Sequence, residues 1–333
     1  IVNSLKKLLQ YGFFAGIAVS LFSQPLARYL NLDSVFPVLA AVILAYAGLI
    51  FTAVLSSLQG LLRFRAYALI WLLDPVFRLF FGASLVLAGF RISGVFFGYI
   101  GGYLAATAAG LWCLRSLLRY PRKEPVNPRE MYAYSLPACA YSAYMAFVMS
   151  ADGLMAKHYF PDAEAGIYVA ASTIAKMMFV VIVPLINVSF SFMSDAVARR
   201  ESPDLFLAKT LRYAAAGSIL MTLLSFAAPS LAIRLTYGPA FHAAAAILPL
   251  TVLALIPPAF AFIYSHYCMA RNASLFVYGL LLGSMIHVIL LVLFHASLVQ
   301  LVLASAAGGI LECLFCVAMD LAGRGKPSPL AST

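Results

Sequence analysis

Pro25-Leu26-Ala27-Arg28 closes one long apolar run of this 333-residue chain, and Pro229-Ser230-Leu231-Ala232-Ile233-Arg234 closes another about two hundred residues later. The residues around both stretches keep one order: a tyrosine, the apolar run, a phenylalanine, a second apolar run and then arginine. They are Tyr11, Phe36, Arg63 and Arg65 in the first copy and Tyr213, Phe241 and Arg271 in the second. Duplicated apolar segments are typical of membrane proteins built from two equivalent helical bundles. The sequence therefore predicts two pseudo-symmetric lobes with a site between them.

The composition independently indicates a membrane protein. Apolar residues make up 64% of the chain and charged residues 10%, and the mean hydropathy is +0.96. A soluble domain is usually about one quarter charged. A helix needs roughly 17 to 25 apolar residues to cross the hydrocarbon core. Ten such runs occur, at residues 9–27, 35–57, 67–89, 93–117, 132–155, 165–191, 209–232, 243–267, 273–294 and 297–319. We expect an all-α, polytopic membrane protein with about ten transmembrane helices.

The basic residues predict the orientation, because Lys and Arg near helix ends are retained in the cytoplasm. One alternating set of loops and helix ends holds Lys6, Lys7, Arg63, Arg65, Arg115, Arg119, Arg122, Lys123, Arg129, Arg199, Arg200, Lys209, Arg212, Arg271, Arg324 and Lys326. The other set holds only Arg28, Arg91, Lys157 and Arg234. Both ends of the chain are therefore predicted to be cytoplasmic. The net charge of +10 then reflects topology and attraction to anionic membrane lipids, and it does not indicate nucleic acid.

The two copies of the repeat differ in what precedes them. The second copy follows two apolar runs, whereas the first follows none. We therefore expect a first lobe of four helices at 1–118, a basic cytoplasmic linker at 119–130, a second lobe of six helices at 131–322 and a cytoplasmic tail at 323–333. If the lobes are equivalent, the source gene continues upstream with a further apolar hairpin; a natural ten-helix protein is the alternative.

Three short stretches carry a resemblance to a known family. Ser150-Ala151-Asp152 ends one helix, Ala165-Gly166-Ile167-Tyr168-Val169-Ala170-Ala171 opens the next, and Tyr237-Gly238-Pro239-Ala240-Phe241 precedes an alanine-rich helix start. In this pattern the second half resembles the C-terminal lobe of the polysaccharide flippases of the multidrug/oligosaccharidyl-lipid/polysaccharide exporter superfamily. The resemblance implies two lobes of twelve or more helices in all, a V-shaped central cavity, and movement of a lipid-linked oligosaccharide to the outer leaflet.

Ionisable residues at membrane depth are the candidate site residues, because each costs several kcal/mol unless it is paired or hydrated. Arg78 and Lys176 fall near the middle of two helices, one in each half, and suit an anionic diphosphate. We predict that both bind substrate. Asp74 lies one turn from Arg78, so it is either a structural partner or a coupling residue. Lys176 has no acid within four residues, which favours a functional role.

The sequence allows two roles for each of two further acids. Asp152 near an outer helix end either binds a coupling ion or lines the cavity, or it caps the helix and is solvated in the loop. Glu312 in the last helix either carries a proton or makes an interhelical hydrogen bond. His266 and His287 match no metal spacing and are interpreted as packing or interfacial residues. Cys313 and Cys316 are interpreted as buried free thiols.

The sequence thus predicts a transporter that is not an enzyme and needs no metal or other cofactor. We expect a flippase or exporter of lipid-linked oligosaccharide or polysaccharide precursor, working by alternating access in a bacterial inner membrane. Its partners would be the lipid-linked saccharide, membrane lipids and other polysaccharide-assembly proteins. A cation-coupled antiporter of drugs or small molecules from the same superfamily is the first alternative. A membrane polysaccharide polymerase or ligase is the second, and it would normally carry a long polar outer loop that this chain lacks.

Overall fold

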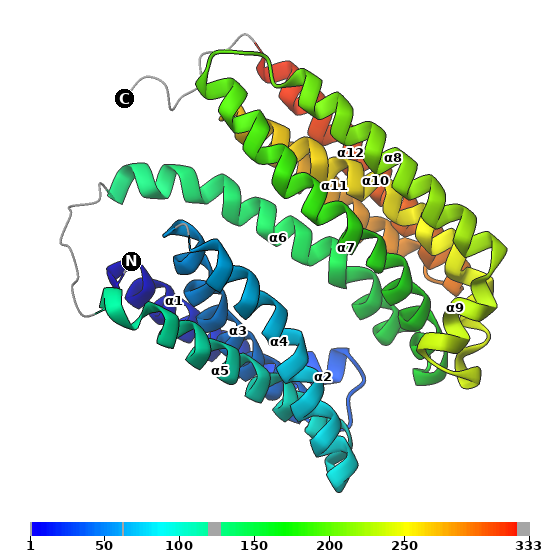
Figure 1. Ribbon diagram of the computed structural model, residues 1–333. Coiled ribbons are helices and arrows are strands. Elements are labelled where there is room, and N and C mark those ends of the chain that lie inside the picture. Colours follow the sequence, from blue (N-terminus) through cyan, green and yellow to red (C-terminus); the bar gives the residue numbers. More distant parts are fainter. Residues whose placement is uncertain (1, 62, 119–127, 325–333) are drawn as a thin grey trace. The chain divides into compact units, whose positions relative to one another are not determined.

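The computed structural model describes residues 2–61, 63–118 and 128–324, and the chain divides into two units, Ile1–Pro125 and Val126–Thr333 (Figure 1). Within the described residues, both units contain helices and no strand. This confirms the predicted all-α fold.

The first unit contains four long helices and one short one. They are α1 (Val2–Leu21), α2 (Ser23–Tyr29), α3 (Phe36–Gly60), α4 (Phe64–Leu85) and α5 (Arg91–Leu118). A π-helical segment, Val86–Phe90, joins α4 to α5. Gly89 in this segment has a φ of +95°, a conformation that glycine adopts without steric cost, and it turns the chain back so that α4 and α5 pack along their lengths.

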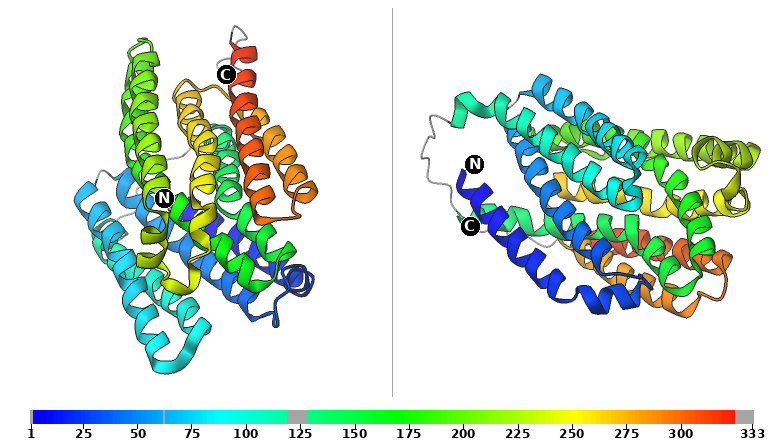
Figure 2. Two further views of the ribbon diagram at one scale, coloured as in Figure 1. Left: turned by 90° about the vertical axis from the view of Figure 1, so that its right-hand side faces the viewer. Right: turned by 90° about the horizontal axis from the view of Figure 1, so that it is seen from below.

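The second unit contains six long helices and one short one. They are α6 (Pro128–Tyr159), α7 (Asp162–Ala198), α8 (Asp204–Ala227), α9 (Pro229–Thr236), α10 (Ala244–Ala270), α11 (Phe276–Leu293) and α12 (Leu298–Gly323), with a 3₁₀ turn at Pro239–Phe241. In Figures 1 and 2 its long helices run side by side. Helix α10 packs against α7, α8 and α12, and α12 packs against α11, so α10 and α12 form the centre of this unit.

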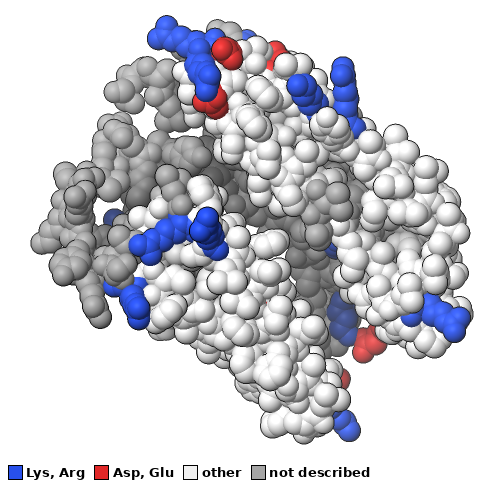
Figure 3. Space-filling model, viewed as in Figure 1, with Lys and Arg blue, Asp and Glu red and all other residues white. Residues whose placement is uncertain are grey.

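Each of the ten long helices of the described chain overlaps one of the ten predicted apolar runs. Seven helical stretches of the described residues are long and apolar enough to cross a membrane, and one of them, Phe64–Arg115, contains α4 and most of α5. The surface seen in Figure 3 is largely uncharged, as contact with lipid requires. The element order of long, short and three long helices occurs twice, as α1 to α5 and as α8 to α12.

The short helices α2 and α9 are a departure from the predicted runs. Runs 9–27 and 209–232 were expected to be continuous, but α1 ends at Leu21 and α8 at Ala227. Ala228 has φ −143° and ψ +49°, because proline at the next position disfavours helical geometry in the residue before it. Each repeat motif therefore forms a separate short helix after the long one.

Candidate functional site

Arg78 is held between an acid and two aromatic rings in the first unit. It forms an ion pair with Asp74 one turn away on α4, and these side chains are 25% and 5% exposed. Its guanidinium carbon lies 5.4 Å from the ring centre of Tyr99 and 4.8 Å from that of Tyr103, both on α5. Gly102 of α5 makes room for it, since a β-carbon there would lie 2.3 Å from the Arg78 Cγ atom. Aromatic faces stabilise the cation, and the carboxylate balances its charge.

Lys176 has an acidic partner on the neighbouring helix. Its ammonium group on α7 donates to the Asp152 carboxylate of α6 at 2.8 Å and to the backbone carbonyl oxygen of Met149 at 2.9 Å. The sequence-based argument that Lys176 lacks a local acid was incomplete, because the acid lies 24 residues away on another helix. The positive charge of the lysine is therefore compensated by the Asp152 carboxylate in this arrangement.

Asp152 does not cap a helix end. Helix α6 continues to Tyr159, and Asp152 is buried. Its other carboxylate oxygen accepts hydrogen bonds from Ser172 at 2.6 Å and from Tyr168 at 3.3 Å, both on α7. The capping interpretation was wrong, because the helix is longer than its apolar run. Asp152 instead joins α6 to α7 through three side chains.

Glu312 of α12 lies in a second buried polar group. Its Oε1 atom is 2.8 Å from Nδ1 of His287 on α11, and its Oε2 atom accepts a hydrogen bond of 3.2 Å from the Tyr144 hydroxyl group of α6. His287 packs against the Phe147 ring, and it is also the direct partner of Glu312, which the sequence did not indicate. His266 does lie in an aromatic cluster, with its ring 4.8 Å from that of Phe262.

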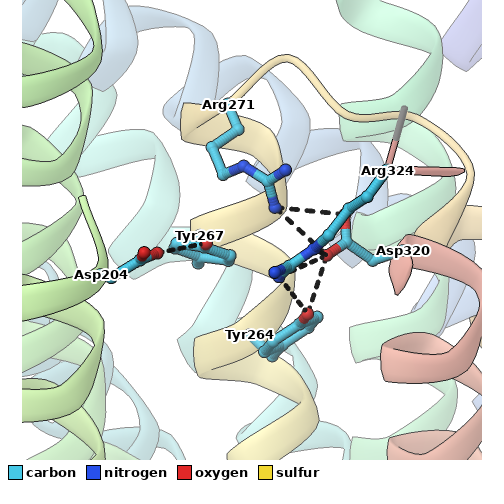
Figure 4. Close-up of polar contacts among 6 residues, drawn as sticks. All are labelled: Asp204, Tyr264, Tyr267, Arg271, Asp320 and Arg324. Atoms are coloured by element: carbon cyan, nitrogen blue, oxygen red, sulfur yellow. Dashed lines mark hydrogen bonds and ion pairs between the residues drawn. The ribbon is translucent and has the colours of Figure 1, made fainter. Parts of the chain in front are cut away.

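A further buried acid, Asp320 of α12, was not identified from the sequence. Its side chain is 2% exposed and accepts hydrogen bonds from Tyr264, Arg271 and Arg324 (Figure 4). The shortest is the Tyr264 hydroxyl contact at 2.8 Å, and the guanidinium contacts of Arg324 are 3.0 and 3.1 Å. The i, i+4 spacing of Asp320 and Arg324 was visible in the sequence and would have indicated part of this cluster.

The same end of the unit contains a second acid contact. The Tyr267 hydroxyl group of α10 donates to Asp204 of α8 at 2.6 Å, and the Arg271 guanidinium lies 5.0 Å from the Tyr267 ring centre. The contacts drawn in Figure 4 therefore link the beginning of α8 with the ends of α10 and α12. These three ends belong to the set of loops predicted to be cytoplasmic.

The structure places the five predicted site residues in three buried polar groups. Asp74 and Arg78 form one in the first unit, while Asp152 with Lys176 and Glu312 with His287 form two in the second. Each cation has a carboxylate partner, so an anionic ligand would have to compete with that carboxylate. Among the described residues, no three or more His, Cys, Asp or Glu side chains form a group that could hold a metal ion.

The fold and these groups can be compared with known proteins. A family model described as "Polysaccharide biosynthesis protein" matches residues 7–246. The chain belongs to this polysaccharide biosynthesis family. The match begins near the start of α1 and ends at the start of α10, so it covers most of the first unit, part of the second unit and four of the five predicted site residues.

Solved structures resembling this family member are transporters. An inward-facing multidrug resistance MATE family transporter of the MOP superfamily matches with a TM-score of 0.75 and 14% identity, over 100% of this chain and 81% of that chain. An outward-facing MATE transporter matches with a TM-score of 0.64 and 15% identity, over 99% and 79%. At this identity the likeness shows the fold alone. No curated protein matches the chain.

Family and fold confirm the resemblance inferred from the sequence. This member of the polysaccharide biosynthesis family is a multi-pass membrane protein with a transporter fold. The buried ion pairs of Arg78 and Lys176 therefore lie within a transporter architecture, where ionisable groups at depth mark substrate or ion pathways.

Proposed function

We propose that the protein is a flippase that moves a lipid-linked oligosaccharide or polysaccharide precursor to the outer leaflet by alternating access. The observation that carries this proposal is membership of the polysaccharide biosynthesis family in a chain with a MATE-like transporter fold. A family that acts in polysaccharide assembly needs a route across the membrane for intermediates whose sugars are too polar to cross lipid unaided.

Arg78 and Lys176 are the residues proposed to contact the substrate. A diphosphate linkage carries more negative charge than one carboxylate, so it competes for a cation that a single aspartate holds. Arg78 offers a planar fork for two phosphate oxygens, and Lys176 offers a compact charge. In this proposal Asp74 and Asp152 hold the two cations in place between transport cycles.

The protein is proposed to act in a bacterial inner membrane, with both ends of the chain in the cytoplasm and with other polysaccharide-assembly proteins as partners. The sixteen-to-four distribution of basic residues between the two sets of loops supports this orientation. The substrate would then be loaded at the end of the second unit that carries Arg271 and Arg324.

Reconstitution tests the proposal. The full-length protein is placed in liposomes that hold a radiolabelled polyprenyl diphosphate disaccharide in one leaflet, and an impermeant glycosidase then reports the sugar that reaches the other leaflet. Faster exposure of sugar than in protein-free liposomes is expected, together with a loss of this activity in a variant in which both Arg78 and Lys176 are alanine. Exposure at the protein-free rate would contradict a flippase.

A drug antiporter is the second candidate, favoured by the pairing of both mid-membrane cations with acids. The same liposomes loaded with ethidium distinguish the two functions. Efflux of ethidium without movement of the saccharide lipid would contradict the flippase proposal and indicate an antiporter of organic cations.

A further inference from the structure

Glu312 and His287 form a closed polar pair inside the second unit. The Glu312 side chain is 0% exposed and that of His287 is 7% exposed. The carboxylate contacts His287 through one oxygen and the buried Tyr144 through the other. Three helices, α6, α11 and α12, each provide one of the three side chains, so the pair does not arise from neighbours on one helix.

Two glycines create the space for this pair, and each lies on the helix opposite the side chain that it accommodates. Gly308 of α12 lies against the His287 ring, where a β-carbon would come within 2.2 Å of Cγ. Gly283 of α11 lies against Glu312, where a β-carbon would come within 2.6 Å of its Cα atom. On each helix the glycine precedes the titratable residue by four positions, that is, by about one turn. The close contact of α11 with α12 is thus fitted to these two side chains.

The groups that face the pair include no lysine or arginine in the described contacts. Helix α6 contributes Tyr144 and the Phe147 ring, 5.3 Å from the His287 ring. Helix α12 adds Cys313 and Cys316, and α10 lies beyond them with Ser265 at 3.8 Å from the Cys316 sulfur. The Nε2 atom of His287 is buried and has no partner among the described residues. Among the described contacts, no other charged side chain compensates a net charge on the pair.

Counting protons shows what the pair can bind. With one proton, either Glu312 and His287 are both neutral or they form a carboxylate and an imidazolium, and the sum of charges is zero. Removing that proton leaves a net charge of −1, and adding a second leaves +1. A buried uncompensated charge is strongly unfavourable. Of these three states, only the one with a single proton carries no net charge.

We propose that Glu312 and His287 form a proton-binding site whose single shared proton is exchanged during the transport cycle of this protein. This deepens the proposed function and rests on it for the transport step, while proton binding itself is a property of the purified protein. The Tyr144 hydroxyl group stabilises the carboxylate in the charged form of the pair.

Infrared difference spectroscopy of the purified full-length protein in nanodiscs, recorded between two pH values, tests the site without a substrate. Glu312→Gln should remove a carboxyl band and alter an imidazole band, and His287→Asn should remove that imidazole band and alter the carboxyl band. Such mutual dependence is the signature of one shared proton. Glutamine keeps the shape of Glu312 and its contact with Tyr144, and Asp195→Asn serves as an exposed control. Difference spectra that neither Glu312→Gln nor His287→Asn changes would overturn the proposal.

A second experiment tests the link to transport. In liposomes with an imposed pH gradient, the wild-type protein should move the polyprenyl diphosphate disaccharide several-fold faster than without the gradient, and Glu312→Gln should show equal rates in both conditions. A gradient response retained by Glu312→Gln would refute the coupling role. Absence of any saccharide movement in the wild type, with the infrared signature present, would instead refute the flippase function and leave the proton site standing.

Discussion

The ammonium group of Lys176 on α7 lies 2.8 Å from the Asp152 carboxylate on α6, and the two side chains are 17% and 10% exposed. Each of the two charged groups is therefore compensated by the other. Removing one partner of a buried pair leaves an uncompensated charge, which typically costs about 3 to 5 kcal/mol, whereas replacing both partners costs much less. This difference separates structural from functional roles of Lys176.

We expect Lys176→Ala alone and Asp152→Ala alone to lower the abundance and melting temperature of the protein. The double variant should recover much of both, because no buried charge is left unpaired. If Lys176 contacts the diphosphate, the double variant should still fail to move saccharide lipid in liposomes. Normal transport by the stable double variant would remove Lys176 from the binding site.

Arg78→Ala should lower transport about tenfold to a hundredfold. A charge-assisted hydrogen bond contributes roughly 1.5 to 3 kcal/mol, and about 1.4 kcal/mol corresponds to a factor of ten. Arg78→Lys keeps the charge but loses the planar group that lies over Tyr99 and Tyr103, so it should recover the activity only in part. Initial rates in the liposome assay, normalised to the amount of inserted protein, give both values. Equal rates for wild type and Arg78→Ala would exclude a substrate contact.

Asp320→Asn should destabilise the second unit by about 1 to 3 kcal/mol, because Tyr264, Arg271 and Arg324 all donate to this one buried carboxylate. Asp195→Asn is the matched control. Asp195 pairs with Arg199 at an i, i+4 spacing with both side chains more than half exposed, and such pairs contribute about 0 to 1 kcal/mol. Thermal unfolding in detergent should separate the two variants, and equal melting temperatures would contradict a stabilising role of the cluster.

Gly308→Ala should also lower stability, since its methyl group would overlap the His287 ring. Overpacking of this kind costs about 1 to 3 kcal/mol, which exceeds the gain of about 1 kcal/mol that alanine brings to a helix. Gly217→Ala on α8 is the control, because nothing lies within 4 Å of a β-carbon at that position. It should be neutral or stabilising in the same unfolding measurement, and a similar loss in both variants would show that the fit around His287 is unimportant.

The helices were predictable from the sequence because membrane depth requires long apolar runs, and all ten runs form long helices in the described chain. The separation of α2 and α9 was not predicted, because apolar residues continue through both breaks. Pro229 was the available sequence signal for the break before α9, whereas only backbone geometry marks the break before α2. Hydropathy therefore identifies a span more reliably than its end.

Contacts of the candidate site were predictable only within one helix. The Asp74 and Arg78 pair follows from i, i+4 spacing. Lys176 with Asp152 and Glu312 with His287 are 24 and 25 residues apart on different helices. Which residues meet then depends on helix rotation and on glycines such as Gly308, whose role appears only when two helices are packed together.

The orientation of the helices gives the last prediction. In a background lacking the five native cysteines, Pro161→Cys between α6 and α7 should react with a membrane-impermeant thiol reagent added outside intact cells. Glu201→Cys between α7 and α8 should react only after the membrane is permeabilised, because Arg199 and Arg200 beside it belong to the cytoplasmic set. Both positions are exposed, so access and not burial decides the result. The reverse labelling pattern would invert the membrane orientation and place the Asp320 cluster on the outer side, opposite to the face from which the substrate is proposed to load.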